Sequence, residues 1–330
     1  MSDPNTLRIL SIDGGGMRGT FSVQWMQEFV NLWGLDNQNE IWKYFDVICG
    51  TSAGGLQALG YAGGLSPANL MAFLENQGPW IFSTSSVIPG VRATLLDKFA
   101  TMILGGSFYP NTNFKTALDD LFGSLKMDSL NVNSLITSYN YNTNTPVLFS
   151  NREFPKSSGK TELLKNVGLS TSSAPLYFPA ANWGGDNFLD GACIKNNPAL
   201  LGYMLGNIVK PTANRTCILT IGSGLGDIGF DQPVITPPPP DESNMSFVFS
   251  LLSILITGTQ ETDALLLENL DQYTLNPLFT YRANAQLDPE LDTELDNSTP
   301  EFIAYMKGLA TTTFNNDLVK ISDFLAHLTL

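Results

Sequence analysis

The spacing of apolar residues along the first third of the chain predicts strands that are each followed by a helix. Residues 7–12 form a short β-type run, and between residues 21 and 33 an aromatic side chain recurs at every fourth position, on one face of a helix. A second strand is expected at residues 44–49, before another helix rich in small residues. Two successive strand, glycine-rich turn and helix units predict an α/β fold with a largely parallel sheet covered by helices.

The rest of the chain continues this pattern. Ser66-Pro67 is an N-cap and first-turn pair that starts a helix, and Gly78 is expected to end it. Another helix is expected to begin at Thr299, and the last thirty residues are typical of two helices. Further strands are expected at residues 134–141, 146–149, 216–221 and 279–282. We interpret residues 1–330 as a single domain with a proline-rich loop near residues 233–244 and a helical C-terminal part.

Composition narrows the class of protein. The chain has 330 residues, of which 43% are hydrophobic and 15% charged, so it can bury a large core and is not a disordered chain. Three widely separated cysteines are typical of a reducing compartment and exclude a cysteine-based zinc site. No signal peptide is visible at the N-terminus, and the longest apolar run, residues 247–256, is too short to span a membrane. We therefore expect a cytoplasmic protein.

The charge is negative and unevenly distributed. The formal net charge is −14, and residues 225–330 carry 16 acidic residues against 3 Lys and Arg. The sequence has no basic patch that could neutralise phosphates, which argues against nucleic acid as a partner. The acidic run at residues 288–296 is the one plausible calcium trap, although its spacing favours a solvated loop.

The glycine-rich turn at residues 13–19 (DGGGMRG) has two interpretations. Gly14, Gly16 and Gly19 fit the dinucleotide fingerprint G-x-G-x-x-G, which would indicate a nicotinamide-dependent oxidoreductase. That interpretation needs an acidic residue at the end of the second strand, and none is present there. Alternatively, the backbone amides of the turn form a cradle for an anion, such as the oxyanion of an acyl-transfer intermediate.

The second turn, residues 50–54 (GTSAG), matches G-x-S-x-G between a strand and a helix, where a serine hydroxyl is exposed on a sharp turn. A nucleophilic serine needs a base, and His327 is the sole histidine of the chain. Because His327 borders the apolar face of a C-terminal helix, we expect it to pack there. A carboxylate in a dry environment can act as the base instead.

The chain resembles the patatin-like phospholipases, a family related to the cytosolic phospholipase A2 enzymes. Three blocks in family order carry the resemblance: residues 13–19, residues 50–55 (GTSAGG) and residues 190–192 (DGA). Weaker family-like stretches occur at residues 171–179, 221–224 and 295–309. The resemblance implies a three-layer patatin-like α/β domain that spans nearly the whole chain.

The resemblance also implies a catalytic dyad of Ser52 as nucleophile and Asp190 as base, with no histidine, metal or cofactor. The implied oxyanion hole is formed by the backbone of Gly14, Gly15 and Gly16, helped by Arg18. The expected function is a calcium-independent lipid acyl hydrolase, phospholipase A, that cleaves glycerophospholipid esters through an acyl-enzyme. The non-enzymatic alternative is a lipid-binding or scaffold protein of the same fold.

A lipid substrate requires contact with a membrane, at least transiently. Residues 80–102 and 247–256 are apolar segments that we interpret as a lid, a membrane-facing ridge or ordinary core helices. Arg92, Lys98 and Lys115 flank the first segment, which makes it the better candidate for meeting lipid phosphates. We expect the protein to be peripheral to membranes when active.

Overall fold

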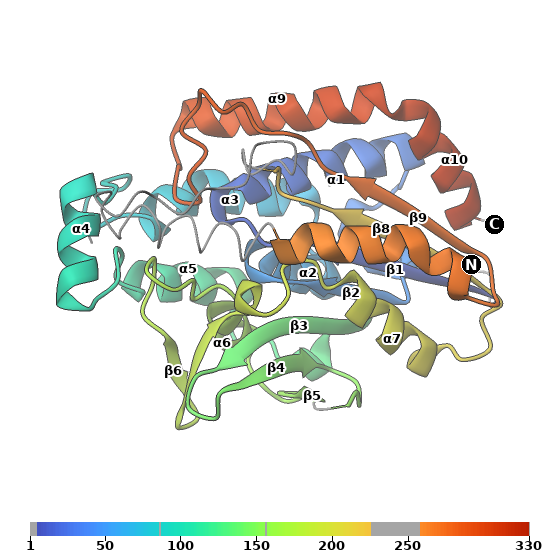
Figure 1. Cartoon of the computed structure of the whole chain (residues 1–330), viewed down its shortest axis with the longest axis horizontal. Helices are drawn as coiled ribbons and strands as arrows, with labels where there is room; N and C mark the ends of the chain where they lie inside the picture. The colour runs from blue at the N-terminus through green and yellow to red at the C-terminus, as the bar shows by residue number, and fades with distance from the viewer. Residues whose placement is uncertain (1–4, 86, 156, 226–257, 330) are drawn as a thin grey trace, which may run out of the picture.

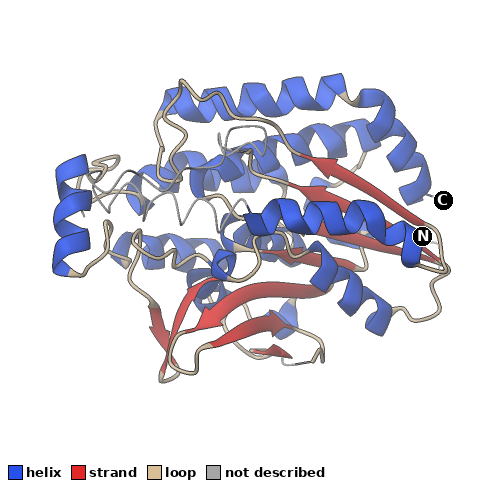
Figure 2. Cartoon of the chain, in the orientation of Figure 1, coloured by secondary structure: helices blue, strands red, loops and turns tan. Residues whose placement is uncertain are grey.

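The computed structural model describes residues 5–85, 87–155, 157–225 and 258–329 (Figure 1). A mixed sheet lies between layers of helices (Figure 2). Its strands are β1 (Thr6–Ile12), β2 (Val47–Gly50), β3 (Asn133–Asn140), β4 (Thr145–Ser150), β5 (Ser157–Ser158), β6 (Ala181–Trp183), β7 (Asp186–Asp190), β8 (Arg215–Ile221) and β9 (Leu278–Ala283). They follow the order β5-β4-β3-β2-β1-β8-β9, with β7 beside β3 and β6 beside β7.

Five neighbouring strands in this order are parallel: β3, β2, β1, β8 and β9. This confirms the expected α/β fold. The strands β4, β6 and β7 add antiparallel pairs at one side. Strand β1 is buried on both faces, as expected for a parallel strand covered by helices on each side.

The described helices are α1 (Gly19–Trp33), α2 (Ser52–Gly63), α3 (Pro67–Ile81), α4 (Leu95–Leu104), α5 (Thr112–Phe122), α6 (Leu164–Thr171), α7 (Ala199–Val209), residues 258–270, α9 (Pro300–Asn316) and α10 (Leu318–Thr329). On one face of the sheet, α7 and residues 258–270 pack against Leu7 and Ile9 of β1. On the other face, α1, α2 and α9 pack against Leu10 and Ile12. Helix α4 stands apart at one end of the molecule (Figure 1).

Several boundaries differ from the sequence prediction. The second strand begins at Val47 rather than at residue 44, because residues up to Tyr44 belong to a short 3₁₀ segment. Helix α3 continues past Gly78 to Ile81. Gly78 does not cap the helix; a Cβ there would collide with the side chain of Met17, so this glycine permits close packing.

The two expected C-terminal helices are confirmed, whereas two other expected segments lie outside the described residues. Helix α9 starts directly after Thr299, whose hydroxyl accepts from the Phe302 amide, and α10 follows as the expected second C-terminal helix. The proline-rich loop near 233–244 and the apolar segment 247–256 fall outside the described residues. Within the described ranges, no helix combines the length and the apolar character that crossing a bilayer requires.

The pairing along β3 determines where the functional side chains meet. Strand β2 runs parallel to the first half of β3 and ends with Gly50 opposite Ile136. Strand β7 runs antiparallel to the second half and ends with Asp190 opposite Ser138. The two strands therefore point toward each other along the same edge of β3, and their ends are two residues apart, about 7 Å.

Candidate active site

Ser52 sits on a strained turn between β2 and α2. It is the first residue of α2 and has a φ of 53°, a left-handed conformation that is unfavourable for a residue with a side chain. Its backbone amide donates to the Thr171 hydroxyl at 2.9 Å. The turn thus has the geometry that the G-x-S-x-G pattern predicts.

The two glycines of this pattern are required by close backbone contacts. A Cβ on Gly50 would overlap the carbonyl oxygen of Gly54, and a Cβ on Gly54 would overlap the carbonyl oxygens of Ile12 and Asp13. The serine turn therefore packs directly onto the end of β1, beside the glycine-rich turn. This packing brings the two motifs of the sequence into contact.

Asp190, at the end of β7, faces Ser52. The Ser52 hydroxyl donates to Oδ2 of Asp190 at 2.6 Å, and the Ala192 amide donates to Oδ1 at 2.8 Å. The Asp190 side chain is buried, and burial raises the pKa of its carboxyl to about 7, although these two hydrogen bonds lower it. A carboxyl group with this pKa can both accept and return a proton near neutral pH.

The backbone amides of the glycine-rich turn are not equivalent. Gly14 donates to the carbonyl oxygen of Asn196 at 3.3 Å, and Met17 donates to the carbonyl oxygen of Leu295 at 2.8 Å. Within the described residues, the amides of Gly15 and Gly16 have no such acceptor. A Cβ on Gly14 would press against Cβ of Ser52, so the turn lies directly against the serine.

These contacts distinguish the residues of the expected oxyanion hole from one another. The amide of Gly14 is engaged by Asn196, which leaves Gly15 and Gly16 as the donors that can face an oxyanion. The Arg18 side chain is engaged by the chain after β9, since its Nε donates to the carbonyl oxygen of Thr293 at 2.6 Å. The reason is the long-range packing of residues 288–297 onto the turn, which local motifs do not reveal.

An apolar pocket opens beside Ser52 and Asp190. Most of its wall is hydrophobic and comes from α2, α3, α5 and the residues after α6. Its apolar side chains include Leu56, Phe73, Ile81, Phe114 and Phe178. Ser52 and Asp190 thus form a buried serine–carboxylate pair in the wall of an apolar pocket.

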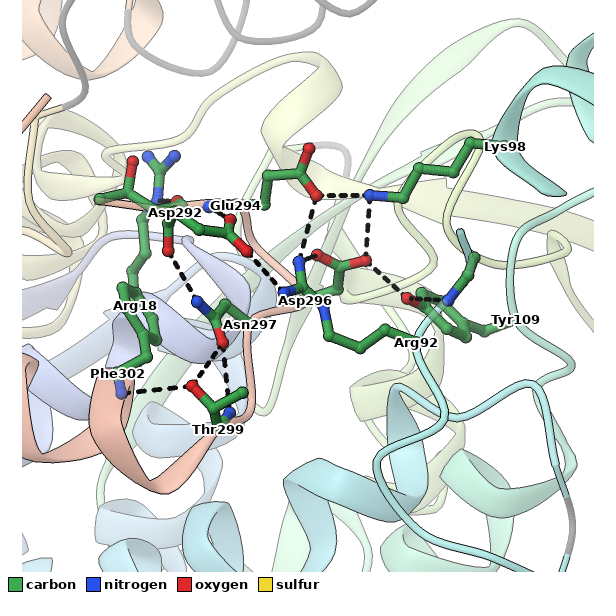
Figure 3. Close-up of polar contacts among 12 residues, drawn as sticks. Arg18, Arg92, Lys98, Tyr109, Asp292, Glu294, Asp296, Asn297, Thr299 and Phe302 are labelled. Atoms are coloured by element: carbon green, nitrogen blue, oxygen red, sulfur yellow. Dashed lines mark hydrogen bonds and ion pairs between the residues drawn. The ribbon is translucent and has the colours of Figure 1, made fainter. Parts of the chain in front are cut away.

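Residues 288–297, which we call the acidic loop, add Leu295 to this wall, and their polar side chains contact Arg92, Lys98 and Tyr109 (Figure 3). Leu295 lines the pocket, and the neighbouring Asp296 is fully buried. Asp296 accepts from Nη2 of Arg92 at 2.7 Å and from the hydroxyl of Tyr109 at 2.6 Å. Lys98 forms ion pairs with Asp296, at 3.3 Å, and with Glu294. The acidic loop is thereby tied to the segment that precedes and begins α4.

The acidic loop was expected to be solvated, and this expectation is wrong for its C-terminal half. Arg92 and Lys98 pair with carboxylates of the acidic loop, so in this structure these two cations are engaged by protein groups rather than available as lipid-phosphate ligands. Apolar side chains are exposed on either side of these cations: Val87 is 77% exposed and Leu104 82%. Among the described residues, no group of three or more His, Cys, Asp or Glu side chains could hold a metal ion.

The other titratable groups lie elsewhere. Asp13 is buried and pairs with Arg282 at 2.8 Å; burial raises its pKa to about 6 although the guanidinium lowers it. The His327 ring stacks on Phe279 of β9, with ring centroids 3.8 Å apart. His327 therefore packs at the C-terminal helix as expected, while the carboxylate that meets Ser52 is Asp190.

Sequence reasoning missed three residues that support this site. Thr171 holds the Ser52 amide, and Asn196 and Ser223 donate to the carbonyl oxygen of Gly14. Thr171 and Ser223 lie in the family-like stretches 171–179 and 221–224, which were the available signals. Asn196 follows the Asp-Gly block by five positions within an Asn-Asn-Pro sequence.

Comparisons with known proteins identify the family of the chain. The family model for patatin-like phospholipases matches residues 10–202. A cGAMP-activated phospholipase of Pseudomonas aeruginosa is 31% identical over 198 residues, which cover 60% of this chain and 56% of that protein. The calcium-independent phospholipase A2-gamma of Mus musculus is 25% identical over 325 residues, 91% of this chain and 38% of that protein.

The solved structure of VipD from Legionella pneumophila has a TM-score of 0.47 and 12% identity, over 96% of this chain and 68% of that chain. The glycine-rich turn and the serine turn lie side by side at the ends of the parallel strands β1 and β2, within an α/β fold. The chain belongs to the patatin-like phospholipase family, because the family model covers more than half of it. It spans about half the length of the first curated relatives that it matches.

Proposed function

We propose that this protein is a calcium-independent lipid acyl hydrolase, most specifically a phospholipase A, that acts through a Ser52–Asp190 dyad. The observation that carries the proposal is the 2.6 Å hydrogen bond between Ser52 Oγ and a buried carboxylate in the wall of an apolar pocket. Two relatives, a cGAMP-activated phospholipase and a calcium-independent phospholipase A2-gamma, support phospholipids as the substrate class.

In the proposed mechanism, Asp190 accepts the Ser52 proton while Oγ attacks the ester carbonyl carbon. The amides of Gly15 and Gly16 bind the resulting oxyanion. The intermediate collapses, the bond to the lysolipid oxygen breaks, and Asp190 returns the proton to that leaving group. Water then attacks the acyl-enzyme, Asp190 takes its proton, and the fatty acid leaves with Ser52 restored.

The exposed apolar residues before α4 and at its end support transient membrane contact as part of this proposal. Val87, Ile88 and Leu104 can enter the interfacial region of a bilayer, and Lys115 is an exposed cation nearby. We propose a cytoplasmic protein that becomes peripheral to membranes when it hydrolyses lipid.

The test is hydrolysis of mixed phospholipid vesicles and of a short-chain ester. It is run with and without cGAMP, because one of the relatives is a cGAMP-activated phospholipase. We expect wild type to release fatty acid and to react with a fluorophosphonate at Ser52. Ser52→Ala and Asp190→Asn should each lose activity by about 10³-fold or more while remaining folded. Ser134→Ala, which changes another buried serine, is the matched control and should retain activity.

The outcomes separate the proposal from its alternative. A folded wild-type protein that binds vesicles but neither hydrolyses lipid nor reacts with fluorophosphonate would support the lipid-binding or scaffold function. Near-normal turnover by Asp190→Asn would show that another group acts as the base.

A further inference from the structure

The carbonyl oxygen of Gly14 is held by two buried side chains that the proposed chemistry does not use. Oγ of Ser223, directly after β8, donates to it at 2.7 Å, and Nδ2 of Asn196, before α7, donates at 3.2 Å. Both side chains are almost fully inaccessible to solvent. Residues from two distant parts of the chain thus converge on one peptide oxygen of the glycine-rich turn.

The orientation of the Asn196 amide is determined by its neighbours. Nδ2 also donates to Oε1 of Gln260 at 3.1 Å, so it lies between two acceptors, where an oxygen would be repelled. The backbone carbonyl of Asn196 in turn accepts the Gly14 amide. Asn196 therefore contacts both the carbonyl and the amide of the same glycine, and it links that glycine to residues 258–270.

Fixing the carbonyl oxygen of Gly14 also fixes the direction of the Gly15 N–H. In a planar trans peptide, the carbonyl of Gly14 and the N–H of Gly15 point in opposite directions. A peptide between two glycines lacks the side-chain restraints that resist rotation, so its orientation must come from outside the turn. The Gly15 amide is one of the two that the described residues leave for an oxyanion.

We infer that Asn196 and Ser223 are positioning residues that aim the Gly15 amide at the oxyanion formed when Ser52 attacks its substrate. Both act through Gly14. This inference rests on the proposed function and extends it, because it assigns a role to two residues outside the dyad and the glycine-rich turn.

The experiment compares two structurally matched pairs of variants. Ser223→Ala and Asn196→Leu remove the two donors to Gly14 and keep similar side-chain volumes. At the opposite end of the sheet, Ser134 Oγ and Asn151 Nδ2 donate in the same way to the carbonyl oxygen of Val132, at 3.2 and 2.8 Å. Ser134→Ala and Asn151→Leu are therefore controls that remove the same chemistry far from the site.

We expect each single variant at Ser223 and Asn196 to lower kcat about tenfold, with KM within a few-fold. The double variant should lose about 10²–10³-fold in kcat, as when one oxyanion donor is removed. The inhibition constant of a trifluoromethyl ketone, whose adduct with Ser52 is itself an oxyanion, should rise by the factor by which kcat/KM falls. The control pair should leave kcat and this inhibition constant unchanged, whatever it does to unfolding in urea.

A folded double variant with wild-type kcat, or equal losses in the control pair, would overturn the positioning role and leave the proposed function standing. A wild-type protein without hydrolysis or Ser52 labelling would overturn both. If Asn196→Leu does not fold, Ser223→Ala decides alone: an unchanged kcat and inhibition constant refute the inference, and a parallel change in both supports it.

Discussion

The acidic loop should be held in place mainly by its one buried carboxylate, and Asp296→Asn tests this. Asp296 is fully buried and bonds Arg92, Lys98 and Tyr109. Removing one partner of a buried ion pair costs about 3–5 kcal/mol. We expect the lower end of this range, about 3 kcal/mol. Arg92 and Lys98 both keep their ion pairs with Glu294, and the side-chain oxygen of the introduced asparagine can still accept from the Tyr109 hydroxyl.

The matched variant is Asp292→Asn, which removes another carboxylate from the same guanidinium. The Asp292 side chain is 50% exposed, so its pair with Arg92 should contribute less than about 1 kcal/mol. The assay is urea unfolding followed by tryptophan fluorescence, in low salt and in 1 M NaCl. Salt should remove the Asp292 effect and leave most of the Asp296 effect. Equal losses below about 1 kcal/mol in both variants would refute the reasoning.

Four further outcomes are expected, two for Asp190, one for His327 and one for metal removal. Because burial raises the pKa of Asp190 to about 7 and the ionised form is the base, kcat/KM should fall about tenfold per pH unit below pH 7; a flat profile to pH 5 would point to another base. A carboxyl whose folded pKa is raised loses stability as pH rises from about 4 through 7, so Asp190→Asn should resist urea better than wild type at pH 8 and not at pH 4. His327→Ala should keep hydrolysis within a few-fold, because its ring packs on Phe279; a 10³-fold loss would restore a histidine base. Hydrolysis should persist in excess chelator, and a loss that calcium reverses would contradict calcium independence.

The parts of the site that follow directly from sequence are those encoded in local turns. A strand that ends in G-x-S-x-G before a helix leaves few options for the backbone, and Ser52 is found on the strained turn that this pattern predicts. The parallel sheet was predictable for the same reason, since each strand and its helix carry their own periodic signal. Asp190 could be named only by family resemblance, because Asp-Gly is also a common turn sequence.

Contacts between distant segments could not be predicted in this way. Arg92 and Asp296 are separated by 204 positions, and neither lies in a periodic pattern that indicates a partner. The sequence shows only that one segment has cations and the other has carboxylates. Likewise, the engagement of the Gly14 amide depends on the position of the Asn196 carbonyl, which is determined by the path of the chain after β7. Both sets of contacts arise from tertiary packing.

In the proposed mechanism, the arrangement around β3 is what allows a dyad to work without a third residue. Strands β2 and β7 end against each other, so Ser52 and Asp190 come from rigid elements and need no third residue to hold the base. The Ala192 amide orients one carboxylate oxygen of Asp190 and leaves the other for Ser52. Burial then raises the pKa of the carboxyl into the range in which an imidazole normally serves. The fold thus supplies, through strand ends and desolvation, the orientation and the proton affinity that a histidine–aspartate pair supplies in a triad.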